Sequence, residues 1–455
     1  MCNDPANVIL RMKAKMKAGP DDAEFTSSEK LLAQMSLSAR KPPVTLTNPE
    51  EAIYIKAVAL SECGRDGEAV RLLFSNPRLP PRGKALKFLH TLERETGQFP
   101  IEAMLAEVKR EGSLKGLDHA NFTGVVKIRK TKDGRGRGIF AEKDIDGGTL
   151  LMAHKAGFVI PLLSFDEALL SAQNRSRLEF WVPLRFMSLQ ASTLSYKMLE
   201  SAHVRQLVSQ LHPQVLASGT EEPPVTAYTP CPPLLSKKLK LNAYQTSDNN
   251  FGFWLTEPTY LNHSCLRNSH KVFVGDFIFV FASRDLKAGD EVTTHYHNSD
   301  WPSERARAGE FHEFTCECIM CQEDSRLSPE VRRELDAIEA EFHQLVEAES
   351  PAAKFVPLLR RLKEPRFKEH KLQPVMPELG NVALMVLRRG TMTEERSILE
   401  ECLDLVVDHA NLGSDLKLMR SLPEIFESRG FKELGKRVRE LPERLPLFKI
   451  PAAFY

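Results

Sequence analysis

Three short segments, taken in order, decide how this sequence is interpreted. They are Leu261-Asn262-His263-Ser264-Cys265, then Gly289-Asp290-Glu291-Val292 with Tyr296 close behind, and then Cys316-Glu317-Cys318-Ile319-Met320-Cys321. The first gathers small polar groups into one loop, and the second is typical of a turn that enters a β-strand. The third places three thiols within six positions, so the first question is whether this region binds a metal.

The crowded cysteines favour a metal site over a disulfide scaffold. Eight cysteines are too few to form a disulfide framework in a chain of 455 residues. Cysteines that are crowded in this way are typical of metal ligands. Zinc takes four tetrahedral ligands, with Zn–S distances near ~2.3 Å. Cys316, Cys318 and Cys321 supply three thiolates from one tight turn, and Cys265 is the natural fourth. Buried thiols are the alternative, and their crowding makes it the weaker one. A site of four cysteines is closed, and hence structural.

Composition limits the partners. The chain has 62 Lys and Arg against 61 Asp and Glu, a formal charge of +1, so nucleic-acid binding through bulk charge is excluded, and a small basic groove is the alternative that stays open. No apolar run approaches the roughly 20 residues that cross a bilayer, and residues 1–17 lack the apolar core of a secretory signal. We expect no membrane partner, no direct nucleic-acid binding, and a reducing compartment, nucleus or cytoplasm. The basic run Lys237–Lys240 is a weak nuclear-import candidate, which we interpret as a solvated loop face.

The length predicts two or three domains. Residues 1–115 are expected to be helical, because Asn48-Pro49-Glu50-Glu51 forms a capped helix start. A single helix–turn–helix copy does not distinguish a repeat from a plain bundle. The remaining segments follow from composition: a β-rich part at 122–164, a helical insert with a Pro-rich loop at 165–240, a second β-rich part at 241–300, the cysteine knuckle at 310–325, and a helical region at 328–455.

Short β-prone runs and one amphipathic stripe support this division. The runs are residues 125–128, 138–141, 149–151, 251–255, 272–274, 277–281 and 292–294, with turns at Asp133-Gly134 and Gly147-Gly148. In the C-terminal region, Ser328-Pro329-Glu330 predicts a helix start. The apolar residues that follow step by three and four: Val331, Leu335, Ile338, Phe342 and Leu345. This stripe predicts a helix that packs against a neighbour.

The glycine-rich segment Gly134-Arg135-Gly136-Arg137-Gly138 admits two interpretations. A dinucleotide site needs a helix directly after the glycines, whereas residues 139–147 are typical of a strand and a turn. The glycines therefore either allow a close approach of the backbone to a ligand or form a turn with solvated arginines. The segment taken alone favours the turn. For the histidines beside Tyr296, His295 and His297, a surface position is favoured over a role as ligands.

The succession of motifs resembles that of the SET-domain protein lysine methyltransferases. The resemblance covers about residues 122–325. It includes the Arg135–Phe140 segment, Asn242 within Leu241–Tyr244, the Asn262–Cys265 loop, Tyr296, and the cysteine cluster preceded by Phe314. The long insert is similar to the split SET domain of the SMYD and related families. The MYND finger of the SMYD family is absent, because Cys231 is the one cysteine in residues 141–261. Arg267 replaces a proline that is usual in the family, while Asn268 is kept.

The resemblance implies an α+β fold: a SET-type β-fold with a post-SET zinc knuckle, flanked by N- and C-terminal helical regions, for which a TPR-like repeat is one of two alternatives. It also implies the site residues. S-adenosylmethionine would be held by Arg135, Gly136, Arg137, Gly138, Asn242, Asn262, His263, Tyr296 and Phe314, with Phe314 on the adenine. Zinc would be bound by Cys265, Cys316, Cys318 and Cys321. Tyr296 would be the catalytic tyrosine. Thr294, two residues before it, stands where the family has a residue that influences the number of methyl groups added.

The implied function is transfer of a methyl group from S-adenosylmethionine to a lysine amine of a histone tail or another protein, by a monomer. The lysine would enter a channel whose wall candidates are Tyr244, Phe251, Trp254 and Tyr260, although more of these are expected in the core. Two other classes stay open: a catalytically idle SET-like scaffold that binds proteins through its helical flanks, and a dinucleotide oxidoreductase, which the strand after the glycines disfavours.

Overall fold

The computed structural model describes residues 84–112, 116–133, 136–161, 208, 238, 241–246, 250–296, 301–305, 314–364, 377–389, 396–410, 416–428, 430–440 and 446–454. The chain divides into two compact units, Met1–Phe122 and Thr123–Tyr455. Several predictions lie outside the described residues: the helix start at Asn48, most of the helical insert, the Pro-rich loop, Arg135 and His297.

The described part of the first unit is helical, as the sequence predicts. Helix α5 spans Lys84–Thr96 and helix α6 spans Ile101–Glu111, ending at Gly112 with φ of 87°. Glu93 of α5 is fully buried and has two partners. Its carboxylate accepts the main-chain N–H of Ala120 at 2.8 Å, and His119 Nδ1 lies 2.5 Å away. Because a buried carboxylate is costly without such partners, this contact fixes the segment that follows α6.

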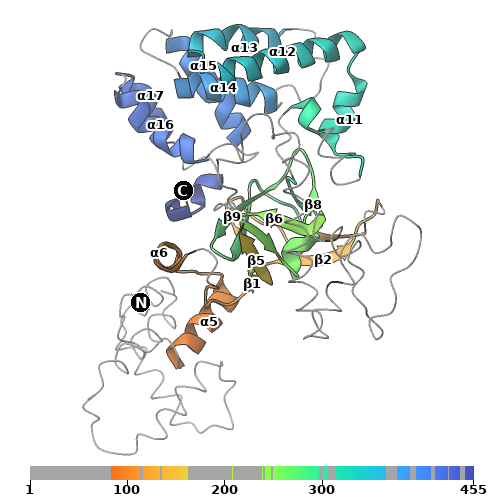
Figure 1. Ribbon diagram of the computed structural model, residues 1–455, viewed down its shortest axis with the longest axis vertical. Coiled ribbons are helices and arrows are strands. Elements are labelled where there is room, and N and C mark those ends of the chain that lie inside the picture. Colours follow the sequence, from red (N-terminus) through yellow and green to blue (C-terminus); the bar gives the residue numbers. More distant parts are fainter. Residues whose placement is uncertain are drawn as a thin grey trace, which may run out of the picture. The chain divides into compact units, whose positions relative to one another are not determined.

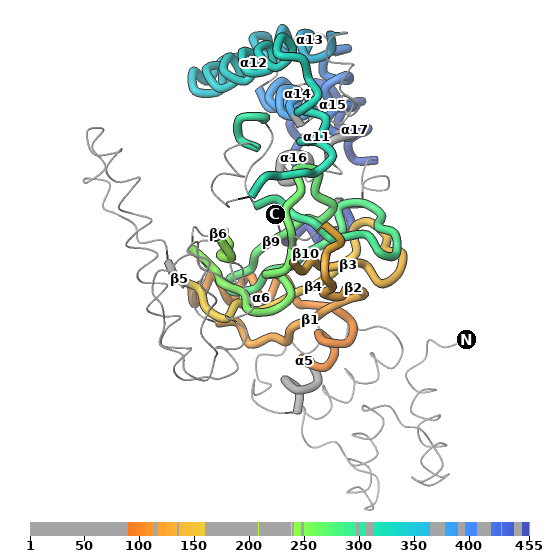
Figure 2. Tube along the Cα trace, turned by 90° about the vertical axis from the view of Figure 1, so that its right-hand side faces the viewer, coloured from red at the N-terminus to blue at the C-terminus, as the bar shows by residue number. Residues whose placement is uncertain are grey.

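The second unit contains the strands. They are β1 (Phe122–Thr123, at the boundary of the units), β2 (Val126–Lys130), β3 (Arg137–Ala141), β4 (Leu150–Lys155), β5 (Phe158–Pro161), β6 (Ala243–Gln245), β7 (Asn250–Phe253), β8 (Asn262–His263), β9 (Ser269–Val274), β10 (Phe277–Ala282) and β11 (Glu291–Thr294). They form three sheets, ordered β1-β4-β10-β9, β2-β3-β11-β8 and β5-β7-β6. Figure 2 follows β2, β3, β4, β9 and β10 through this part of the chain.

Strands β2, β3, β4, β7, β9, β10 and β11 arise where the β-prone runs predict them, whereas β1, β5, β6 and β8 had no predicted run. Strand β10 is buried along its whole length, and it pairs with β4 on one side and β9 on the other. The apolar side chains between the sheets form one core, which includes Ile139, Met152, Trp254, Ile278 and Val292. The glycine segment precedes strand β3 rather than a helix, so the dinucleotide interpretation is wrong.

The remainder of the second unit is helical. Its elements are η4 (Glu257–Tyr260), α11 (Ile319–Arg326), α12 (Pro329–Glu347), η5 (Ala352–Lys354), α13 (Val356–Leu362), α14 (Pro377–Arg389), α15 (Arg396–Ala410), α16 (Leu416–Ser428), α17 (Lys432–Glu440), η9 (Pro446–Lys449) and η10 (Ala452–Phe454). Figure 1 shows α12 to α15 packed together beside α16 and α17. The α+β class is confirmed.

Helix α12 begins as the sequence predicts. Ser328 is its N-cap, and the Ser328 hydroxyl accepts the Val331 N–H at 3.3 Å. The apolar stripe of α12 is buried in a second core with α13, α14 and α15. The chain then returns to the β-fold, because Phe454 packs on Phe279 and Phe281 of β10, with ring centroids 5.0 and 5.6 Å apart. Among the described residues, no helix is long and apolar enough to cross a membrane.

One prediction about the insert is wrong. Lys238, within the basic run Lys237–Lys240, is fully buried, and its Nζ donates to the Val208 carbonyl at 3.1 Å. A lysine that is held inside the protein cannot belong to a solvated face, and it is not free for an import receptor. Burial of the amine is compensated by that hydrogen bond.

Candidate functional site

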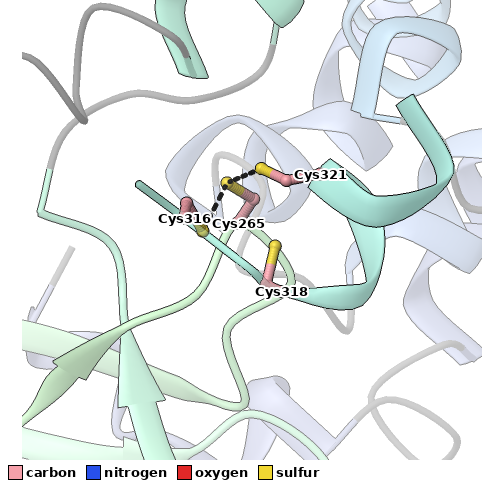
Figure 3. Close-up of side chains that lie close together, drawn as sticks. All are labelled: Cys265, Cys316, Cys318 and Cys321. Atoms are coloured by element: carbon pink, nitrogen blue, oxygen red, sulfur yellow. Dashed lines mark hydrogen bonds between the residues drawn. The ribbon is translucent and has the colours of Figure 1, made fainter. Parts of the chain in front are cut away.

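Four cysteines converge on one point, as the sequence predicts. The sulfur atoms of Cys265, Cys316, Cys318 and Cys321 all lie within 4.8 Å of one another, and Figure 3 shows these side chains directed toward a common centre. Cys265 Sγ is 3.9 Å from Cys316 Sγ and 3.5 Å from Cys321 Sγ. Tetrahedral zinc with ~2.3 Å bonds separates its sulfur ligands by ~3.8 Å, so this cluster has the dimensions of a metal site and not those of a disulfide.

The cluster joins a loop of the β-fold to the first helix after it. Cys265 lies in the turn that follows β8, and Cys318 is the N-cap of α11, which also carries Cys321. The knuckle is therefore a loop that enters a helix, rather than one tight turn as the spacing alone suggests. Met320 and Leu266 are buried against the sulfurs. The ligands are thus fixed by packing on one side, which suits a closed structural site.

His263 connects this cluster to Tyr296. Its Nδ1 accepts the main-chain N–H of Tyr296 at 3.1 Å, so the ring proton is on Nε2, which lies 3.3 Å from Cys265 Sγ. The rings of His263 and Tyr296 have centroids 5.3 Å apart. A histidine that donates to a metal-bound sulfur orients that ligand. The cysteine cluster and the candidate catalytic residue therefore share one side chain.

The pairing of β8 with β11 creates this arrangement. The two strands are parallel, with Asn262 opposite Thr293 and His263 opposite Thr294. Tyr296 follows β11 directly, so the parallel register brings it beside His263. The Tyr296 hydroxyl donates to the Leu261 carbonyl at 3.0 Å. Phe314 completes the group, with its ring centroid 5.6 Å from His263 and 6.1 Å from Tyr296.

Asn262 lies against the glycine segment. Its Nδ2 donates to the Arg137 carbonyl at 3.1 Å and to Glu291 Oε1 at 2.6 Å. Gly138 makes room for both side chains, because a Cβ there would lie 2.4 Å from Glu291 Oε1 and 2.9 Å from Asn262 Nδ2. Close approach is thus the requirement at Gly138. Gly136 has φ of 95°, which favours glycine in this loop, and the Arg137 guanidinium lies 4.5 Å from the Tyr260 ring centroid.

The hydrogen-bond partners of Asn242 differ from those of Asn262. Its Nδ2 donates to the Lys238 carbonyl at 2.7 Å, and its Oδ1 accepts the Thr259 hydroxyl at 3.4 Å. Asn242 therefore fixes the start of β6 against η4. Its role toward S-adenosylmethionine stays a prediction, as does that of Arg135, which lies outside the described residues.

Sequence reasoning overlooked several residues around Tyr296. His295, for which a surface position was favoured, is half-buried, and its Nε2 donates to the Cys265 carbonyl at 2.9 Å. Arg267 Nη1 donates to His295 Nδ1 at 3.2 Å. Burial, followed by the charge of Arg267, holds the pKa of His295 well below its ordinary value. The replacement of the expected proline at residue 267 is the sequence signal that could have pointed to this pair.

Three aromatic side chains pack together at the core of the β-fold. Tyr244, Trp254 and Phe273 contact one another with ring centroids 5.6 to 6.3 Å apart. The Tyr244 hydroxyl donates to the Pro258 carbonyl at 2.6 Å. Burial raises the pKa of Tyr244 above its ordinary value, and the nearby Tyr296 adds to this rise. Trp254 is fully buried, which agrees with the expectation that several channel candidates belong to the core.

Known proteins supply an independent comparison. The model of the SET domain matches residues 136–297. A Gibberella zeae protein named Methyltransferase is 24% identical over 326 residues, which are 63% of this chain and 44% of that protein. This chain thus spans less than half the length of that relative.

Solved structures of the SET domain of LSMT were also matched. The one bound to lysine and AdoHcy is 12% identical, covers 76% of this chain and 92% of its own, and gives a TM-score of 0.23. The one bound to MeLysine and AdoHcy is 14% identical, with coverages of 77% and 93% and a TM-score of 0.24. These scores are too low to argue from. The family match, together with the methyltransferase relative, confirms the predicted resemblance, and residues 136–297 form a SET domain.

Proposed function

We propose that this SET-domain protein is an S-adenosylmethionine-dependent protein lysine methyltransferase. One observation carries the proposal: the parallel pairing of β8 with β11 sets Asn262 opposite Thr293 and brings His263 beside Tyr296, within the matched SET domain. Asn262, His263 and Tyr296 are the residues to which the resemblance assigns cofactor binding and catalysis.

The residues present suit S-adenosylmethionine. This group supplies an activated methyl on a positively charged sulfur. The Arg137–Gly138 backbone, the Asn262 amide and the Glu291 carboxylate form a polar, partly acidic surface that a side chain at residue 138 would obstruct. The Phe314 ring beside His263 offers an apolar face for an adenine. Gly136, Arg137, Gly138, Asn262, His263 and Phe314 would therefore hold the methyl donor.

The chain's own residues then position the acceptor. In the transfer, the lone pair of a neutral lysine nitrogen forms a C–N bond while the C–S electron pair stays on sulfur, and one proton leaves the nitrogen for solvent. Tyr296 is fixed through its main-chain N–H and its hydroxyl, so it can align the amine, and such positioning contributes much of the rate. Burial of the acceptor beside a cationic donor lowers the pKa of its amine.

The four cysteines are proposed to bind one structural zinc ion, because four thiolates at these separations need a central cation. The remaining proposals concern partners. We infer that the substrate is a lysine of a histone tail or of another protein, that the enzyme acts as a monomer, and that it works in the nucleus or the cytoplasm, with neither membrane nor nucleic acid as a direct partner.

A labelling experiment tests the function. The purified protein is incubated with tritiated S-adenosylmethionine and, separately, with core histones, ribosomal proteins and a fractionated lysate, and labelled bands are hydrolysed to identify methyllysine. We expect label in methyllysine with the wild type and little with Tyr296→Phe. Binding of S-adenosylmethionine without transfer to any fraction would contradict the proposal and favour an idle scaffold.

A further inference from the structure

His295, the residue directly before Tyr296, is hydrogen-bonded through both nitrogens of its ring. Arg267 Nη1 donates to His295 Nδ1 at 3.2 Å, and His295 Nε2 donates to the Cys265 carbonyl at 2.9 Å. An arginine side chain carries donors only, and a carbonyl oxygen accepts only. The two contacts therefore require the ring proton on Nε2, and the contact with Arg267 selects that tautomer.

The peptide group that joins His295 to Tyr296 is held at both of its polar atoms. Its oxygen, the His295 carbonyl, accepts from Lys271 Nζ at 2.5 Å, and its N–H, that of Tyr296, donates to His263 Nδ1 at 3.1 Å. Because a peptide group is planar, two such contacts fix its orientation. The direction in which the Tyr296 side chain leaves the main chain is thus set by groups outside strand β11.

Two histidines bind one residue of the loop that follows β8. His263 Nε2 lies 3.3 Å from Cys265 Sγ, whereas His295 Nε2 donates to the carbonyl of the same cysteine, and the centroids of the two rings are 6.2 Å apart. In the described residues, the pairing of β8 with β11 ends at Thr294. The side chain of His295 therefore continues the attachment to this loop beyond the paired strands, at the residue that precedes Tyr296.

We propose that His295, held by Arg267, is a positioning residue that sets the orientation of Tyr296 for methyl transfer. The inference rests on the proposed function. Displacement of a reacting group by ~1 Å can lower a rate by ~10²-fold, so neither His295 nor Arg267 needs to contact the substrate to affect catalysis. A proline at residue 267, which the resemblance led us to expect, has no side-chain donor for this contact.

A double-mutant cycle tests the inference. Wild type, Arg267→Met, Tyr296→Phe and the combined variant are compared with tritiated S-adenosylmethionine and whichever of the core histones or ribosomal proteins the wild type methylates. Methionine keeps an unbranched apolar side chain and removes the donors. We expect Arg267→Met to lower kcat by about 10- to 100-fold while the KM for S-adenosylmethionine changes by less than about threefold. The combined variant should lose little more than Tyr296→Phe alone, because the hydroxyl through which Arg267 acts is already absent.

Conservative variants and a control sharpen the cycle. His295→Leu should lower kcat as much as Arg267→Met does. His295→Gln, whose amide carries both an acceptor and a donor, should recover most of that loss. Arg396→Met makes the same substitution at an arginine whose side chain is 59% exposed, and it should keep the wild-type rate. If Arg267→Met does not fold, Arg267→Lys, which keeps one donor group, takes its place in the cycle with a smaller loss.

Hydrogen–deuterium exchange gives a readout that needs no catalysis. Mass spectrometry of the peptide that contains Tyr296 should show faster exchange in Arg267→Met than in wild type or Arg396→Met, with zinc content at the wild-type level. Unchanged exchange, loss of zinc from Arg267→Met, or rate losses that multiply in the combined variant would overturn the inference, because each indicates a merely structural role. A wild type that transfers no methyl group would refute the proposed function, and the exchange measurement would still decide whether Arg267 and His295 position Tyr296.

Discussion

The cysteine cluster and the surroundings of Tyr296 are built in opposite ways. Three of the four cysteines lie within six residues, and all four contribute a side-chain sulfur. The Tyr296 region collects groups from four distant stretches, and two of its contacts are main-chain carbonyls, those of Leu261 and His295. A side-chain ligand can be recognised from its residue type in the sequence. A main-chain carbonyl cannot, because any residue can supply one. His263 contacts both regions. A substitution in one region should therefore alter the properties of the other.

Loss of a zinc ligand should have the largest effect. Cys318→Ser removes one of four thiolates, and the binding free energy of a structural zinc is on the order of 10 kcal/mol. We expect loss of bound zinc, a marked fall in melting temperature and weaker binding of S-adenosylmethionine, measured by elemental analysis, thermal unfolding and calorimetry. Cys402→Ala, a buried cysteine in the helical core, should keep its zinc. Full zinc content in Cys318→Ser would exclude the cysteine site.

The second-largest effect is expected from replacing Arg305, which anchors helix α11 next to the cysteine cluster. Arg305 is buried, with Nε 2.8 Å from Asp324 of α11 and Nη2 2.8 Å from Glu378 of α14. Arg305→Leu leaves two acids buried without their partner, which costs about 3–5 kcal/mol, measured as the free energy of unfolding in urea. The exposed pair is the control: Arg396→Leu should cost less than about 0.5 kcal/mol. Equal losses of unfolding free energy in the two variants would show that the buried ion pairs of Arg305 contribute no more to stability than an exposed pair.

Tyr296→Phe should separate catalysis from binding. It removes a hydroxyl that donates to Leu261 and little volume, so the fold and the affinity for S-adenosylmethionine should change little. Loss of a preorganised polar group costs on the order of 10²–10³ in rate in acyl-transfer sites, and we expect a fall of that size in labelled methyl transfer. Tyr260→Phe, which keeps its ring under Arg137, should stay near the wild-type rate. A wild-type rate in Tyr296→Phe would remove the tyrosine from the mechanism.

His263→Ala should show the smallest effect and affect both regions. Loss of the side chain that orients a metal ligand typically lowers metal affinity by about 10–100-fold, and the main-chain N–H of Tyr296 loses its acceptor. We therefore expect earlier zinc release in a chelator competition, together with weaker binding of S-adenosylmethionine. His343→Ala, which removes a half-buried histidine of α12 that contacts neither the cysteines nor Tyr296 in the described part of the chain, is the control. If zinc release were unchanged, the two regions would be independent.

Sequence patterns anticipated the elements that depend on local chemistry. The β-prone runs became β2, β3, β4, β7, β9, β10 and β11, and Ser328 caps α12. Spacing also singled out Cys316, Cys318 and Cys321, and the Asn262–Cys265 loop supplied Cys265 as the fourth candidate; the fold brings the four sulfurs together. Asn262, His263, Tyr296 and Phe314 were proposed through the resemblance, and the fold brings His263, Tyr296 and Phe314 together.

The tertiary structure alone decided what surrounds Tyr296. Lys271 and His295 are polar residues next to β-prone runs, and alternation along a strand cannot tell whether such side chains meet solvent or another strand. The parallel register of β8 with β11 and the placement of β9 beside that strand end settled it. The sequence by itself determined seven of the described strands, the start of α12 and three candidate metal ligands, since these follow from neighbours along the chain. The contacts of the half-buried Lys271 side chain required the fold, because its amine meets a carbonyl 24 residues away and the Tyr244 ring on β6.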